Sequence, residues 1–597
     1  MKLHMKKLKF STLLILALGL GMSCKDDFLK VAPNGSLSTQ VMATTKGVQT
    51  LLISAYSMLD GTSSVVGGWE AATSNWVYGG ICGGDAHKGT DEGDQPDINP
   101  IARYEATATN SYFNGKWSSL YEGISRANAT LNLLATVVAA DGGTGTIISA
   151  ADAKSINAQA RVLRGFYHFE AKKMFNNIPY IDEKAAATDP SKVKNDVDAW
   201  PMIEADLNAG YTDLPETMDA VGRINKWVAG ALLAKAYMYE SKFTAALPIL
   251  TAIRTSGKNP LGTKFQLNAK FGDNFNAATK NSPEDVFSVQ YSVNDGSGGW
   301  NGGWGEVLNF PYKSGESPAG CCGFYQPSSD LVNAFRTDAS GLPILTVGAN
   351  NVPDYNLPAN AIKDDLGIES TAAFTPDAGN LDPRLDWTVG RRGIPYLDWG
   401  VMTGKDWTRK QIYGGPYSPK KQVYYKSQSG TYTDKSSWTE GYTANNYRMI
   451  RLADIILMEA EAEAQAGSLA NALTLVNMIR TRAALPAGFV QNAAGTGPAA
   501  NYVISNYVSF PDKATALKAI KMERRLELAM EGHRFFDLVR WGDAATVLNA
   551  YIAYESTKFA YYGGATFKTG KNEYFPIPQR QIDLIGKDIL AQNSAGN

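Results

Sequence analysis

The chain has 597 residues, too many for one ordinary hydrophobic core, so we expect at least two packed units. Lys and Arg together number 57 against 58 for Asp and Glu, and this lack of a basic excess argues against nucleic acid as the main partner. Aromatic residues make up 11% of the chain, which suits either a recognition surface or a large helical core.

The N-terminus has the pattern of a secretory signal. Lysines without acids precede an apolar run at residues 13–20, and small residues then lead to Cys24. The run is too short for a comfortable transmembrane helix. The end of the run resembles a lipobox, in which Cys24 is acylated and becomes the first residue of the mature chain. Ordinary cleavage to a soluble periplasmic protein is the alternative.

The body of the chain is predominantly helical. Apolar periodicity predicts helices at residues 37–59, 117–134, 159–175, 201–214, 226–240 and 243–254. An internal repeat is also present, because residues 246–255 match residues 472–481 and each segment follows an Ala-rich helix. This pattern predicts tetratricopeptide-like helical hairpins. Since the repeats are not contiguous, we expect a wrapped scaffold with insertions.

Two long insertions interrupt the helices, at residues 61–104 and about 294–444. Loops of this length are usually functional or disordered, and their many Trp and Tyr residues disfavour disorder. The acidic part of the first insertion, residues 85–97, has three interpretations. We prefer the interpretation as a solvated loop. The alternatives are a calcium site and a pair of catalytic carboxylates.

Apart from the open calcium interpretation of residues 85–97, the sequence gives no indication of a cofactor or a metal site. It contains no nucleophile elbow, Walker loop or dinucleotide fingerprint, and its Cys and His residues lack zinc-binding spacing. If Cys24 is acylated, Cys82, Cys321 and Cys322 remain. An odd number leaves one thiol over, and bridging the neighbours Cys321 and Cys322 requires strain, so their pairing is left open.

A charged and aromatic stretch at residues 520–542 predicts two helices joined at Gly532. Glu523, Glu527 and Glu531 share one helix face, where like charges repel. We prefer a semi-buried ion-pair network to a solvated face. The candidate partners are arginines nearby in sequence or from another helix pair: Arg451, Arg480, Arg482, Arg524, Arg525, Arg534 and Arg540.

Residues 523–542 resemble the C-terminal signature of the SusD/RagB family, surface lipoproteins of gut and oral Bacteroidetes that bind nutrients for import. Other stretches resemble the family pattern at residues 117–128, 159–175, 222–226, 381–385, 451–461 and 575–583. The resemblance implies a scaffold whose helices face a SusC-like TonB-dependent transporter. Lys25, Asp26 and Asp27 resemble the acidic export signal of lipoproteins that face the cell surface.

The glycine-rich segments of the two insertions supply the candidate ligand residues. Indole and phenol faces cover the apolar C–H faces of sugars, and carboxylates and amides bond their polar edges. Trp300 and Trp304 are either displayed for this purpose, as we prefer, or plug the seam between loops and helices. If the insertions converge, the predicted platform contains Trp76, Tyr78, Asp85, Trp300, Asn301 and Trp304.

These observations predict a non-enzymatic, lipid-anchored outer-membrane protein that binds an oligosaccharide and delivers it to a SusC-like transporter. The alternatives are a repeat scaffold that binds only proteins, and a surface glycosidase. We divide the chain into five parts. Residues 1–23 are a signal peptide and residues 24–37 a lipidated tether. An N-terminal helical region with the ligand-loop insertion 61–104 spans residues 38–293, a loop-rich lobe spans 294–445, and a C-terminal helical region spans 446–597.

Overall fold

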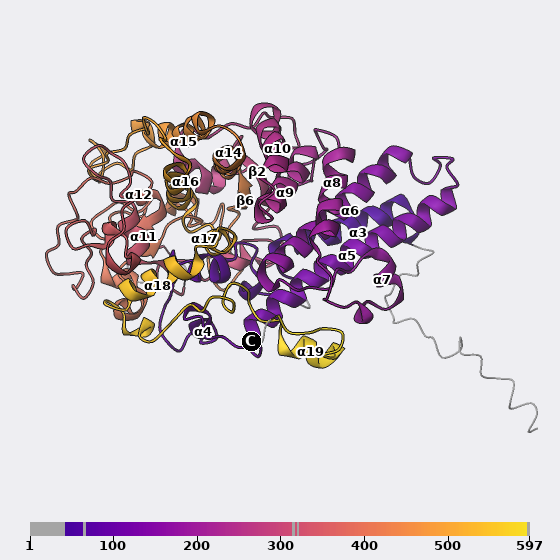
Figure 1. Cartoon of the computed structure of the whole chain (residues 1–597), viewed down its shortest axis with the longest axis horizontal. Helices are drawn as coiled ribbons and strands as arrows, with labels where there is room; N and C mark the ends of the chain where they lie inside the picture. The colour runs from indigo at the N-terminus through magenta and orange to yellow at the C-terminus, as the bar shows by residue number, and fades with distance from the viewer. Residues whose placement is uncertain (1–41, 64–66, 313–316, 319–320, 594–597) are drawn as a thin grey trace, which may run out of the picture.

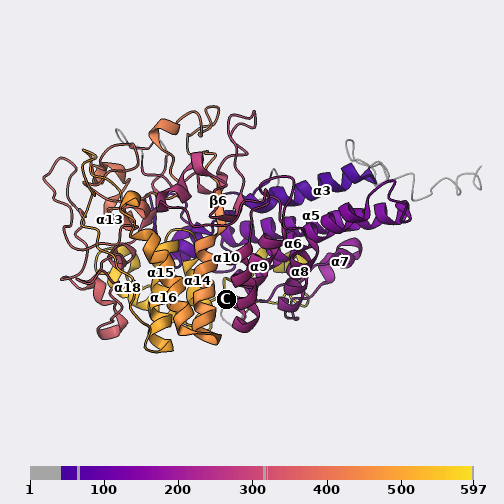
Figure 2. The same cartoon turned by 90° about the horizontal axis from the view of Figure 1, so that it is seen from above.

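A computed structural model describes residues 42–63, 67–312, 317–318 and 321–593 of the chain. Helices dominate it, and they form a continuous layer that runs along the length of the molecule (Figure 1). The loop-rich segments gather on the opposite side, so that the molecule has a helical side and a loop side (Figure 2). Cys24, Lys25, Asp26 and Asp27 lie outside the described residues.

The first part of the helical layer follows the predicted order. Its helices are α3 (Thr45–Ser57), α5 (Ser111–Asp141), α6 (Ala150–Phe175), α8 (Trp200–Asp213), α9 (Lys226–Tyr239) and α10 (Phe243–Ser256). Each predicted helix is present: α5 and α6 extend beyond the predicted bounds, and α3 is shorter than the predicted 37–59, of which residues 37–41 lie outside the described residues. Side-chain caps fix several starts: the Asn225 side chain, for example, accepts a hydrogen bond from the Val228 N–H at the start of α9.

The second part of the layer repeats the hairpin geometry. Helices α14 (Leu452–Ala466) and α15 (Leu469–Ala483) pack together as α9 and α10 do, and α10 packs directly on α14. The two hairpins that contain the sequence repeat therefore meet in space, through α10 and α14, although about two hundred residues separate them in the chain. The remaining helices are α16 (Lys513–Leu528), α17 (Arg534–Arg540), α18 (Ala544–Glu555) and α19 (Gln579–Ile585).

A short antiparallel pair closes the base of the second insertion. Strand β2 (Asp285–Val289) pairs with β6 (Tyr447–Arg451), so the chain leaves the helical layer and returns to it at one place. Two further pairs join loops, β1 (Ala86–Gly89) with β3 (Phe324–Pro327) and β4 (Val389–Gly390) with β5 (Ser418–Pro419). The short helices of the two insertions are α4 (Ile98–Ala102), α11 (Ser329–Ala334), α12 (Leu385–Thr388) and α13 (Gln411–Gly414), whereas α7 (Glu183–Thr188) packs against α5. The β1/β3 pair brings the two insertions together.

A buried network of acids and arginines ties the loop side to the helical layer. Glu523, Glu527 and Glu531 are almost fully buried, as the preferred interpretation of this column predicted. Glu527 alone pairs with three arginines. The network consists of Glu284, Glu523, Glu527 and Glu531 with Arg384, Arg451, Arg480, Arg482 and Lys421.

The predicted partners Arg451, Arg480 and Arg482 are confirmed in this network, whereas Arg384 and Lys421 come from the loop-rich insertion and were not predicted. Of the arginines nearest in sequence, Arg524, Arg525 and Arg540 pair elsewhere, for example Arg540 with Glu461 at 2.7 Å. Although burial alone would raise its pKa, the surrounding arginines hold the pKa of the Glu527 carboxyl well below its usual range.

Candidate functional site

Three tryptophans from the two insertions stack on the loop side. The rings of Trp300 and Trp304 lie 4.6 Å apart with an interplanar angle of 16°. Trp69, from the first insertion, stacks on the other side of Trp304 at 6.1 Å and 22°. The insertions therefore converge as predicted, but the first one contributes Trp69 in place of the predicted Trp76 and Tyr78.

A second pair of rings extends the stack. Tyr442 is buried and its ring centroid lies 5.3 Å from that of Trp304. Trp438 meets Tyr442 edge to face and donates a 3.0 Å hydrogen bond to its hydroxyl. Trp300 is 53% exposed and Trp438 is 60% exposed, and they are the two aromatic members among the exposed large apolar side chains of the described residues. We call Trp69, Trp300, Trp304, Trp438 and Tyr442 the aromatic cluster.

Local hydrogen bonds fix the backbone that carries Trp300. The Asp295 carboxylate accepts bonds from the Ser297 N–H at 3.0 Å and from the Asn301 amide at 2.9 Å. Bonds from Ser292, Ser297 and Asn301 hold the pKa of Asp295 well below its usual range. Gly299 has a φ of +91°, and a Cβ there would lie 3.2 Å from the Tyr442 ring. A glycine at this position lets the loop turn directly against the aromatic cluster.

A groove adjoins this loop. It has a cavity volume of about 410 Å³, and Asn301, next to Trp300, lines one end of it. Polar groups face the groove from three other segments, among them Asp60, Arg223 and Gln290. Burial raises the pKa of Asp60 to about 7, and the nearby Glu306 carboxylate adds to the rise. An exposed aromatic cluster thus lies beside a groove with hydrogen-bonding groups.

The prediction that Trp76 and Tyr78 are displayed at this surface is wrong. Both are 1% exposed, because residues Trp76–Ile81 form a single π-helical turn inside the protein. The indole N–H of Trp76 donates to the Gly305 carbonyl at 3.0 Å, and the Tyr78 hydroxyl to the Tyr112 carbonyl at 2.9 Å.

The glycines beside these aromatics explain the burial. A Cβ at Gly79 would lie 1.7 Å from the carbonyl oxygen of Gly532, so the π-helical turn packs backbone against backbone on the C-terminal segment. Glycine here permits close approach rather than a flexible surface loop. The C-terminal segment is shaped to match: α16 ends at Leu528, earlier than predicted, and Met530 and Gly532 both have positive φ angles.

Asp85 is also displaced from its predicted role, because its side chain is buried. One carboxylate oxygen lies 3.5 Å from Nε of Arg525, and the other accepts a bond from the Met530 N–H at 3.3 Å. Burial raises the pKa of Asp85, and Arg525 opposes the rise. Asp85 therefore belongs to the packing between the first insertion and α16.

The acidic loop is held by cations from the second insertion. Arg409 pairs with Asp91 at 2.9 Å and with Asp94 at 2.7 Å, and Lys410 pairs with Glu92. The Lys88 ammonium donates to the Asp94 carbonyl within the same loop. Nowhere in the described ranges do three or more His, Cys, Asp or Glu side chains gather as a metal site would require.

The cysteines divide as follows. Cys321 and Cys322 are joined as a vicinal disulfide, a pairing that the sequence left open. Cys82 is a buried free thiol, and burial raises its pKa.

Across the described part of the chain, no helix is both long enough and apolar enough to cross a bilayer.

Sequence reasoning missed Trp69, Trp438 and Tyr442. A signal for Trp69 was present, since the triplet Gly-Gly-Trp occurs three times, ending at Trp69, Trp300 and Trp304. These three tryptophans are the ones that stack. Trp438 and Tyr442 carry no comparable motif, and only the fold places them beside Trp304.

The chain is similar to known proteins over most of its length. The model of the SusD family matches residues 283–595, and a model described as "Starch-binding associating with outer membrane" matches residues 87–238. SusD-like protein P38 of Formosa agariphila is 23% identical over 566 residues, which cover 91% of this chain and 93% of that protein. A SusD-like protein of Bacteroides ovatus is 29% identical over 140 residues, covering 23% and 24% of the two chains.

Solved structures share the fold. A SusD superfamily protein from Bacteroides vulgatus superposes with a TM-score of 0.63 at 20% identity, over 92% of this chain and 99% of that one. A laminarin-binding SusD-like protein gives 0.61 at 23% identity, with the same coverage. Surface glycan-binding protein A from Bacteroides thetaiotaomicron in complex with laminarihexaose superposes with a TM-score of 0.62 at 20% identity, over 92% of this chain and 99% of that one. The predicted fold, a largely α-helical tetratricopeptide-like scaffold with long loop insertions, is confirmed.

Proposed function

The chain belongs to the SusD family, and from that premise we propose that it binds an oligosaccharide through the aromatic cluster and passes it to a SusC-like TonB-dependent transporter. The observation that carries this proposal is the parallel stacking of the exposed Trp300 on Trp304, with the exposed Trp438 against the neighbouring Tyr442. Two structural neighbours are described as binding laminarin or laminarihexaose, which supports a glycan as ligand.

The chemistry of the cluster matches a sugar. Rigid indole faces lose little conformational entropy on contact, and they suit the flat C–H faces of pyranose rings. The adjoining groove offers acceptors and donors for hydroxyl groups, including Asp60 and Asn301. Since the cluster is open to solvent on one side, we expect affinities between about micromolar and millimolar. Such affinities allow release to a transporter.

The ion pairs of the acidic loop support binding rather than glycosidase chemistry. A catalytic carboxylate pair needs free oxygens on either side of the scissile bond. Asp91 and Asp94 instead share the Arg409 guanidinium, and Glu92 pairs with Lys410. We therefore propose that the bound glycan is recovered uncut.

The family model and the N-terminal sequence support a proposal for the location. One matching family model is described as associating with the outer membrane, and residues 1–23 have the pattern of a signal that precedes Cys24. We propose that Cys24 is acylated and that Lys25, Asp26 and Asp27 direct the protein to the cell surface. The transporter partner is inferred from family membership.

A glycan panel tests this function. Isothermal titration with laminarihexaose, maltohexaose, cellohexaose and xylohexaose identifies the ligand, and chromatography after long incubation checks that it is intact. Trp300→Ala and Trp438→Ala should each weaken binding by roughly tenfold, while Ile412→Ala, an exposed apolar control on α13, should not. Binding unaffected by both tryptophan variants would place the ligand elsewhere. Cleaved products would favour the glycosidase alternative. Binding of a protein, with no binding of any glycan, would favour the repeat-scaffold alternative.

A further inference from the structure

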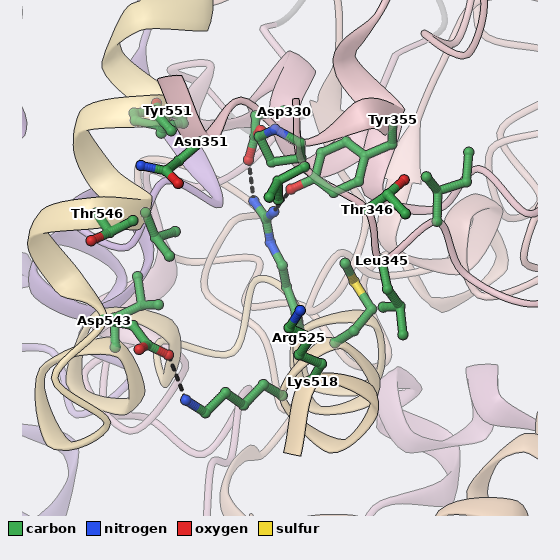
Figure 3. Close-up of a pocket in the computed structure, with 18 of the residues that line it drawn as sticks. Asp330, Leu345, Thr346, Asn351, Tyr355, Lys518, Arg525, Asp543, Thr546 and Tyr551 are labelled. Atoms are coloured by element: carbon green, nitrogen blue, oxygen red, sulfur yellow. Dashed lines mark hydrogen bonds and ion pairs between the residues drawn. The ribbon is translucent and has the colours of Figure 1, made fainter. Parts of the chain in front are cut away.

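A second pocket lies in the C-terminal helical region, between α16, α17, α18 and the segment 344–355 (Figure 3). Its cavity volume is about 280 Å³. Of the described residues that line it, none lines the groove or belongs to the aromatic cluster. We call it the α16–α18 pocket, and the proposed glycan binding does not use it.

Most of the walls of the α16–α18 pocket are hydrocarbon. They come from the segment before Tyr355 and from all three helices: Ile344, Leu345, Met522, Leu538, Val547 and Ala550. Such walls favour a ligand that carries an apolar body. The volume corresponds to a small molecule rather than to a long chain.

Arg525 forms the polar core of the pocket, and its terminal nitrogens are paired with protein groups. Figure 3 shows its side chain extending from α16 toward Asp330 and Tyr355. The guanidinium pairs with the Asp330 carboxylate at 2.6 Å and donates to the Tyr355 hydroxyl at 2.8 Å. Its Nε has no hydrogen-bond acceptor but lies 3.5 Å from the Asp85 carboxylate, so two carboxylates, Asp85 and Asp330, balance the charge of Arg525.

Arg534, at the start of α17, differs because its charge has no partner. Among the described residues, none forms a hydrogen bond or an ion pair with it, and its Nε is buried without an acceptor. Burial, together with the neighbouring Arg525, lowers the pKa of Arg534 to about 10, and the Asp85 and Asp330 carboxylates oppose the fall. A buried donor without an acceptor is costly, and more so in a charged group, so an incoming acceptor is favoured.

The other charges of the pocket add to this imbalance. Lys521 already pairs with Asp543 at 2.6 Å, and Lys518 is exposed beside them. The lining thus contains four cationic side chains, namely Lys518, Lys521, Arg525 and Arg534, and two anionic ones, Asp330 and Asp543. The charged side chains of the lining therefore sum to a net positive charge, and apolar side chains surround them.

We propose that the α16–α18 pocket binds a small carboxylate with an apolar body, whose carboxylate pairs with the Arg534 guanidinium. The planar fork of arginine donates two parallel N–H bonds to a carboxylate. The hydrocarbon walls would cover the rest of the ligand. A strongly hydrated dianion such as phosphate gains nothing from these walls.

Phenylacetate is a suitable probe, with the neutral isostere phenylacetamide and inorganic phosphate as comparisons. Titration followed by ligand-observed NMR should show saturable binding of phenylacetate to the full chain. Phenylacetamide should bind at least about tenfold more weakly because it lacks the charge that Arg534 recognises. Phosphate binding that depends on Arg534, or equal binding of acid and amide, would overturn the proposal.

Two variants locate the binding. Arg534→Gln removes the cation and should weaken phenylacetate binding by about tenfold or more. Because Arg534 is largely buried and this variant can fail to fold, Thr546→Trp provides a second test, since Thr546 is exposed at the pocket and a bulky side chain there blocks it. Ala553→Trp, also exposed on α18 but outside the lining, is the matched control.

We expect Thr546→Trp to abolish phenylacetate binding and Ala553→Trp to preserve it. Binding to Thr546→Trp at wild-type affinity, or no binding of phenylacetate to the wild-type chain up to about 10 mM, would refute the proposal. Trp300→Ala should bind phenylacetate normally, so failure here is distinguishable from failure of the proposed glycan binding.

Discussion

Glu527→Gln tests whether the buried network holds the loop side to the helical layer. The Glu527 carboxylate accepts bonds from Arg384 at 3.0 Å, from Arg451 at 2.6 Å and from Arg482. The substitution keeps the shape but removes the negative charge among these three cations. Breaking a buried pair on one side costs about 3–5 kcal/mol, because the remaining charge stays buried without compensation.

Differential scanning calorimetry measures this cost. We expect the Tm of Glu527→Gln to fall by on the order of 5 °C. Glu369→Gln is the matched control, because Glu369 pairs with Lys405 in solvent, where such a pair contributes less than about 1 kcal/mol. If the Tm of Glu527→Gln differs from that of the wild type by no more than the Tm of Glu369→Gln does, the reasoning is refuted.

The pH dependence gives an independent check on the network. The folded-state pKa of Glu527 is depressed by Arg482, Arg451 and Arg384 against the effect of burial, and that of Glu531 falls to about 2. A carboxyl with a depressed pKa contributes stability above its unfolded pKa of about 4.3, and that stability is lost as pH falls toward the folded value. The Tm difference between wild type and Glu527→Gln should therefore narrow between about pH 4.5 and pH 2.

Two further predictions concern packing and anchoring. Gly79→Ala should lower the Tm strongly, because the added Cβ would lie 1.7 Å from the Gly532 carbonyl oxygen. Gly93→Ala is the control and should not lower the Tm, because the nearest atom to its Cβ lies 3.7 Å away. Equal Tm values for the two variants would contradict the close approach of Gly79 to Gly532. Cys24→Ala should abolish acylation and mislocalise the protein, and alanines at Lys25, Asp26 and Asp27 should leave it acylated but facing the periplasm. Protease treatment of intact cells measures this, and wild-type protein that resists it while a known surface protein is cut would refute the surface location.

The helical layer could be predicted because its signals are local. Apolar periodicity marked α5, α6, α8, α9 and α10, and the repeat in residues 246–255 and 472–481 indicated the paired hairpins. The Glu523, Glu527 and Glu531 column indicated a buried network for a similar reason. Like charges on one helix face need partners, and their residue types are visible in the sequence.

The failures concern contacts between distant segments. Glycines beside Trp76 and Tyr78 have the same appearance in the sequence as those beside Trp300, yet Gly79 packs on Gly532 while Gly299 turns against Tyr442. Which glycines face a neighbouring backbone depends on segments hundreds of residues away. Arg384 and Lys421 were missed as network partners for the same reason, because the insertion that carries them reaches the network only in the folded chain.

The most direct test of the proposed function is titration of the glycan selected by the panel into the double variant Trp300→Ala/Trp438→Ala. Both side chains are more than half exposed, so their removal should leave the Tm unchanged. If the aromatic cluster is the binding site, affinity should fall by about a hundredfold or more, since two contacts of about tenfold each are lost. A double variant that melts like wild type and binds the glycan with wild-type affinity would contradict the account.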